Sequence, residues 1–144
     1  MRLPTPAITM RRFGFLLFLA LILFTGCDSG SSGPPMLDGD YTLETQGGGA
    51  AYTFEITLSE SNQSLSGNGT LTVEDQDSQQ AATSDLDVDG SHDHPSARIE
   101  MVAVDTETND LTTLDGEVSD DAERISGTLT FPSGTQQQVT MRRE

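Results

Sequence analysis

The chain has 144 residues with 23 acidic and seven basic side chains, a formal net charge of −16 at pH 7 and one cysteine. All the acidic residues follow Cys27, together with four of the arginines, so the part after Cys27 carries a net charge of −19 and contains no lysine. This charge repels nucleic acid, so we expect no nucleic-acid partner, and a lone cysteine excludes an intrachain disulfide.

The first 26 residues have the parts of an export signal. Three arginines are the only charges before Cys27, and an apolar run from Phe13 to Phe24 follows them, interrupted by Gly14. As a helix this run would span about 18 Å, which is short of the ~30 Å hydrocarbon core of a bilayer. We therefore expect residues 1–26 to be a signal peptide that is removed from the mature protein, with Met10 as the true initiator.

The apolar run leads into the sequence Leu23-Phe24-Thr25-Gly26-Cys27. This sequence resembles the lipobox of bacterial lipoproteins, in which an apolar residue and two small ones precede an invariant cysteine. The resemblance implies a diacylglycerol on the Cys27 sulfur and a further acyl chain, such as palmitate, on the new amino terminus. Two or three chains hold a protein on a bilayer essentially permanently. We expect a lipoprotein of the bacterial cell envelope, on its periplasmic or surface face; the alternative is a free cysteine after an ordinary secretory signal.

A change of composition follows the cysteine. Residues 27–35 read Cys-Asp-Ser-Gly-Ser-Ser-Gly-Pro-Pro and hold no side chain that could anchor a core, so we expect a flexible tether that carries the lipid. Residues 36–144 are enough for one domain and too few for two. We expect this domain to be monomeric and to be stabilised by packing alone.

Apolar and polar residues alternate along the domain. From position 52 to position 58 the even residues are Tyr, Phe, Ile and Leu, and the odd residues are Thr, Glu and Thr. A period of two residues predicts a strand with one apolar face. The same pattern predicts eight strands, near residues 39–45, 51–59, 64–74, 84–90, 96–105, 111–119, 123–131 and 136–142. No segment has the 3.6-residue period of a helix.

The connections between these strands are short and rich in turn-forming residues, which favours sequential antiparallel hairpins. We therefore expect an all-β fold, a single small antiparallel up-and-down β-barrel of about eight strands, because closure removes the exposed edges of an open sheet. A two-layer β-sandwich is the alternative. Two similar segments, Leu65–Thr72 and Ile125–Thr130, contain glycines at inward positions, where they would relieve crowding in a bent strand.

The first and last strands carry a second resemblance. Gly39-Asp40-Tyr41 in the first strand and Arg142-Arg143 in the last are similar to small barrels of the lipocalin and avidin kind (calycins). Those barrels often start with Gly-x-Trp, whose ring packs under the barrel against an arginine of the last strand. The resemblance implies one closed end and an opposite mouth that could admit a small apolar ligand; the alternative is an interior filled by side chains.

The segment from Asp85 to His94 is the best candidate for chemistry. Its start matches the opening Asp-x-Asp-x-Asp-Gly of a calcium loop, but position 12 is Ser96 in place of glutamate. On an extended strand alternate residues lie ~6.6 Å apart, too far for their carboxylates to converge on one cation, so a curled loop would be required. The histidines, expected in a turn, are candidates for zinc or copper. The candidate metal ligands are Asp85, Asp87, Asp89, His92, Asp93 and His94; the alternative is a solvated strand face.

Signals of catalysis are absent from the sequence, which has no nucleophile motif, phosphate-binding loop or lysine base. We therefore expect a non-catalytic envelope lipoprotein with a structural or protein-interaction role. The alternatives are a lipocalin-like carrier of a small apolar ligand and a calcium-binding envelope protein. The acidic, lysine-free composition is similar to that of halophilic bacterial proteins, where salt at 1 M screens charges beyond ~3 Å; an acidic surface that binds cations is the rival explanation.

Overall fold

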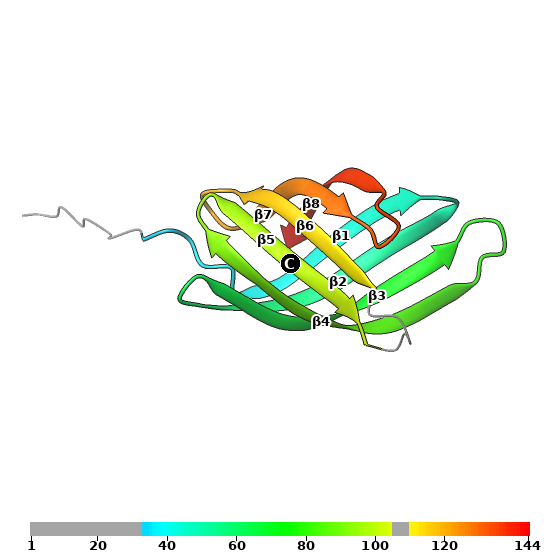
Figure 1. Cartoon of the computed structure of the whole chain (residues 1–144), viewed down its shortest axis with the longest axis horizontal. Helices are drawn as coiled ribbons and strands as arrows, with labels where there is room; N and C mark the ends of the chain where they lie inside the picture. Colours follow the sequence, from blue (N-terminus) through cyan, green and yellow to red (C-terminus); the bar gives the residue numbers. More distant parts are fainter. Residues whose placement is uncertain (1–32, 105–109) are drawn as a thin grey trace, which may run out of the picture. The chain divides into compact units, whose positions relative to one another are not determined.

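The computed structural model describes residues 33–104 and 110–144, which form eight antiparallel strands (Figure 1). The strands are β1 (Gly39–Gly47), β2 (Ala50–Ser61), β3 (Ser64–Asp75), β4 (Ala81–Asp93), β5 (Ser96–Ala103), β6 (Leu111–Val118), β7 (Arg124–Thr130) and β8 (Gln136–Arg143). Each strand pairs with the next in the chain, and β8 pairs with β1 to close a barrel. The predicted all-β, eight-stranded barrel is confirmed, and the sandwich alternative is wrong.

Several sequence predictions lie outside the described residues. These are the signal peptide at residues 1–26, the start at Met10, lipid attachment at Cys27 and most of the tether. In the two described ranges, no helix is long and apolar enough to cross a membrane.

Large apolar side chains fill one end and the middle of the barrel. Every second residue of each strand points inward. The inward residues that are less than 2% exposed include Tyr41, Leu43, Phe54, Ile99, Met101, Leu114, Ile125, Leu129 and Met141. Burying such a side chain contributes about 1.5–3 kcal/mol to folding. This layer is the hydrophobic core that stabilises the closed barrel.

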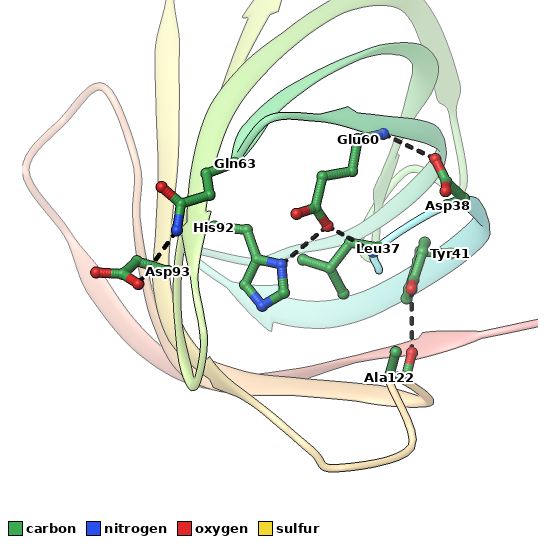
Figure 2. A network of polar contacts seen from close by, with 8 residues as sticks. All are labelled: Leu37, Asp38, Tyr41, Glu60, Gln63, His92, Asp93 and Ala122. Atoms are coloured by element: carbon green, nitrogen blue, oxygen red, sulfur yellow. Dashed lines mark hydrogen bonds and ion pairs between the residues drawn. The ribbon is translucent and has the colours of Figure 1, made fainter. Parts of the chain in front are cut away.

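The chain enters the barrel at its filled end, which we call the closed end. Leu37, two residues before β1, is 0% exposed, and Tyr41 is 1% exposed. Figure 2 shows both side chains at this end. The Tyr41 hydroxyl donates a hydrogen bond of 3.0 Å to the carbonyl oxygen of Ala122, in the connection between β6 and β7. Arg143 is the register partner of Tyr41 across the β1–β8 pair. The tyrosine of the first strand therefore lies beside an arginine of the last strand.

We expect Tyr41→Phe to destabilise the domain by about 1–3 kcal/mol, because it leaves the buried Ala122 carbonyl without its donor. Burial raises the pKa of Tyr41 above its usual 10.0, an effect that the Arg143 charge partly opposes. Folding thus favours the neutral phenol, and stability falls as the pH rises above about 10. Urea unfolding at pH 7 and above pH 10 should show that the variant is less stable at pH 7 and depends less on alkaline pH. Tyr52→Phe is the control, and equal effects of both changes would contradict the prediction.

The β1–β8 pair is short. Among the described residues, only two pairs are in register, Tyr41 with Arg143 and Thr42 with Arg142, and both lie next to the closed end. Farther along, the Gln137 side chain joins the two strands: its amide nitrogen donates to the Gln46 carbonyl oxygen at 2.9 Å, and its amide oxygen contacts the Thr45 hydroxyl. A side chain therefore continues the closure of the barrel toward its other end.

Candidate functional site

The end of the barrel opposite Leu37 contains a cavity of about 410 Å³, which we call the cup. The start of β1 and the ends of β4, β6 and β8 lie at the closed end, so the cup is formed by the opposite ends of the strands and their connections. Its apolar wall consists of Tyr52, Leu71, Val73, Leu86, Ala103 and Phe131. These residues come from β2, β3, β4 and β5 and from the position after β7.

An aromatic pair forms part of the cup wall. The rings of Tyr52 and Phe131 have centroids 5.0 Å apart and planes inclined by 52°. Tilted pairs at this distance are favourable, and each ring presents a flat apolar surface. Both residues are only partly buried, in contrast to Phe54, which is 0% exposed two positions after Tyr52 on the same face of β2. The wall above Phe54 therefore has apolar surface that no side chain of the described residues fully covers.

Polar side chains also line the cup. They are the hydroxyl-bearing Ser84, Thr112, Ser133 and Thr135, the amide-bearing Gln137 and the carboxylate-bearing Asp110. Thr112 is 6% exposed, whereas Asp110 is exposed, so the polar groups extend from the wall to the rim. A mostly apolar cavity with a few polar groups is the common form of a small-molecule site.

The candidate metal ligands of β4 are not brought together. Asp85, Asp87 and Asp89 are exposed on the outer face of the extended strand, whereas His92 is 2% exposed and points inward. The strand does not curl into a loop, because it pairs with β3 and β5 along most of its length. Over residues 33–104 and 110–144, no group of three His, Cys, Asp or Glu side chains is placed to hold a metal ion.

The expectation that both histidines lie in a turn is wrong for His92. β4 continues to Asp93. In its last part Gly90 pairs with Ile99 of β5 and His92 pairs with Ala97, so both positions continue the inward face of the strand. His94 does lie between the strands, 3.6 Å from the Asp120 carboxylate. Its ring is nearly perpendicular to that of His92, with centroids 5.9 Å apart.

His92 belongs to a polar network at the closed end that the sequence did not indicate (Figure 2). Its Nδ1 lies 2.9 Å from Oε2 of Glu60, and the same oxygen accepts a hydrogen bond of 2.8 Å from the backbone N–H of Leu37. The backbone N–H of Glu60 in turn donates to Asp38 at 2.8 Å. The Glu60 side chain is 9% exposed. This network joins the ends of β2 and β4 to the chain that leads into β1, and its role is structural.

A second hollow, of about 650 Å³, lies on the outer face of β1 to β4. It is lined by outward side chains that include Asp40, Glu55, Asp85 and Asp87. It has no aromatic wall comparable with that of the cup, since Tyr41 points inward at this place and is buried. The cup is therefore the stronger candidate for a specific ligand.

Comparison of the chain with protein-family models, curated proteins and solved structures finds no match.

Proposed function

We propose that this protein is a lipid-anchored protein of the bacterial cell envelope that binds a small apolar ligand in the cup, without catalysis. The observation that carries the binding role is the cavity of about 410 Å³ with its partly exposed aromatic pair. Ligand cavities in proteins commonly measure about 300–1,000 Å³. The anchor rests on the lipobox-like sequence that ends at Cys27.

The arrangement of the domain suits such a role. The chain enters at the closed end, next to Leu37, whereas the cup lies at the opposite end of the strands. An anchor at Cys27 would therefore be linked to the domain through the end that lies opposite the cup. The cup favours binding over a purely structural role, because its aromatic pair is only partly buried, whereas the core residues Phe54 and Leu129 are 0% exposed.

A matched pair of tryptophan substitutions tests this function. Ser84→Trp places a large ring inside the cup, whereas Thr83→Trp places the same ring on the exposed outer face of β4. The full chain, in phosphatidylcholine nanodiscs, would be titrated with the neutral fluorescent probe N-phenyl-1-naphthylamine. We expect Ser84→Trp to weaken binding by about tenfold or more, equal to a loss of about 1.4 kcal/mol, and Thr83→Trp to leave it nearly unchanged.

Both variants should melt cooperatively, which separates a blocked cup from an unfolded barrel. Equal probe binding by the wild type and both folded variants would mean that the fluorescence comes from the lipid or from another surface. That result would overturn the binding role and favour a structural or protein-interaction role for the domain.

A further inference from the structure

The ends of the barrel differ in charge. All four arginines of the described residues lie toward the closed end: Arg98 near the start of β5, Arg124 at the start of β7, and Arg142 and Arg143 at the end of β8. The described charged residues at the cup end include Glu44, Glu74, Asp75, Asp77 and Asp110, and all of these are acidic. The mouth of the cup is therefore negative, with no arginine of the described residues near it to offset the charge.

One of these carboxylates, that of Asp75, is held by hydrogen bonds from the turn that follows β3. Asp75 accepts hydrogen bonds from the backbone N–H groups of Ser78 and Asp77 and from the Ser78 hydroxyl. These hydrogen bonds hold the pKa of Asp75 below its usual range, and those from Ser78 have the largest effect. Asp110 lines the cup itself and starts the segment that leads into β6. A charged group that enters the cup therefore meets the Asp110 carboxylate, while Asp75 lies at the end of β3 on the same end of the barrel.

The chemistry of the wall points the same way. A carboxylate ligand would need a basic side chain or a set of donors, and no Lys, Arg or His is among the described residues that line the cup. An ammonium group instead finds the Asp110 carboxylate, the hydroxyl oxygens of Ser84 and Thr112 and the faces of Tyr52 and Phe131. Cations over aromatic faces gain about 0.5–2 kcal/mol.

We infer that the cup selects its ligand by charge, binding small apolar molecules that carry an amine or another cationic head and rejecting anionic amphiphiles such as fatty acids. This inference rests on the proposed function, and it adds the class of ligand. The body of the ligand contacts Leu71, Val73 and the aromatic pair, while its head lies toward Asp110 at the rim.

Three ligands with one naphthalene ring and different charges test the selection. They are 1-naphthylmethylammonium, 1-naphthylmethanol and 1-naphthoate, each used to displace N-phenyl-1-naphthylamine from the full chain in phosphatidylcholine nanodiscs. At 10 mM salt, where the screening length is about 30 Å, we expect the cation to bind at least about tenfold more tightly than the anion. At 1 M salt the screening length is about 3 Å, and the difference should shrink severalfold.

Asp110→Asn should weaken binding of the cation by about three- to fivefold relative to the neutral 1-naphthylmethanol, the effect of one charge about 5 Å away in water. The matched control is Asp93→Asn, which removes an exposed carboxylate at the closed end of β4 and should change the preference much less. Equal binding of the cation and the anion at low salt, with Ser84→Trp still blocking both, would overturn the charge selection and leave the binding role intact. Displacement that is the same in Ser84→Trp would overturn the binding role itself.

Discussion

Replacing Gly127 with alanine is expected to destabilise the barrel by about 3 kcal/mol, and Gly127→Val is expected to prevent folding. A Cβ atom on Gly127 would lie 2.1 Å from the Asp115 carbonyl oxygen and 2.4 Å from the Cα of Gly116, its register partner on β6. Both contacts are with backbone, so no rotamer change can relieve them. The strands must move apart, and overpacking of this kind costs about 1–3 kcal/mol or more.

The expected destabilisation by Gly127→Ala is opposite in sign to the usual effect of a Gly→Ala substitution. Where space is free and φ is suitable, Gly→Ala stabilises a protein by about 0.4–1 kcal/mol, because alanine restricts the unfolded chain. Thermal unfolding should show a midpoint at least about 10 °C lower for Gly127→Ala, since 1 kcal/mol corresponds to about 4–8 °C in a domain of this size. Ser126→Val is the control, because it adds more bulk at the next residue but on the exposed face of β7. A midpoint unchanged or raised in Gly127→Ala would contradict the close approach of β6 and β7.

The same glycines show how much of the fold was predictable from the sequence. The two similar segments at Leu65–Thr72 and Ile125–Thr130 were expected to be barrel strands with glycine at inward positions, and they lie in β3 and β7. A Cβ atom on Gly69 would lie 2.3 Å from the Glu55 carbonyl oxygen. Alternation and glycine placement are local properties that predicted the strands, whereas the short connections and the removal of exposed edges predicted their order and the closure of the sheet.

The ends of strands were harder to predict where inward positions are polar. β4 was expected at residues 84–90 and runs from Ala81 to Asp93, because its pairing with β3 continues beyond the alternating pattern. Glu60 and His92 also continue the inward series, two positions after Leu58 and Gly90. Charged residues are rarely buried without a partner, so the pattern alone predicted that the strands had ended. Glu60 and His92 are partners of each other, and they come from β2 and β4. These two strands are not neighbours in the sheet, because β3 lies between them.

The alternation of apolar and polar residues could not predict whether the interior is filled or contains the cup. Alternation predicts that Tyr52 points inward, and it does, but the same pattern holds for Phe54, which is packed in the filled core. Whether an inward ring meets another side chain or open space depends on the stagger of the strands and the width of the barrel. These properties belong to the whole closed sheet and not to any segment of sequence.

Removing the Glu60 carboxylate is expected to have an effect as large as that of Gly127→Ala, at the closed end. In Glu60→Ala the backbone N–H of Leu37 and the Nδ1 of His92 both lose their partner, and both residues are almost fully buried. His92 Nε2 already has no hydrogen-bond partner among the described residues, so the whole imidazole would be left without one. Each buried group left unpaired costs about 1–3 kcal/mol, which predicts a loss of about 2–4 kcal/mol in urea unfolding.

Glu55→Ala is the matched control, because Glu55 lies on the same strand but is exposed on its outer face. It should change stability by less than about 0.5 kcal/mol. Glu60→Gln keeps one acceptor oxygen and should fall between the two. If Glu60→Ala were no more destabilising than Glu55→Ala, the closed-end network would contribute nothing measurable to folding.

The position of Glu60 at the closed end also predicts that Glu60→Ala changes the closed end of the barrel but not ligand binding in the cup. Its carboxylate holds the chain at Leu37, so hydrogen exchange of the Leu37 amide should become faster in Glu60→Ala than in Glu55→Ala. The cup is built from the opposite ends of the strands, so the folded variant should still bind N-phenyl-1-naphthylamine with nearly wild-type affinity. Faster exchange at Leu37 together with a marked loss of probe binding would show that the two ends are coupled, contrary to the independence that this geometry predicts.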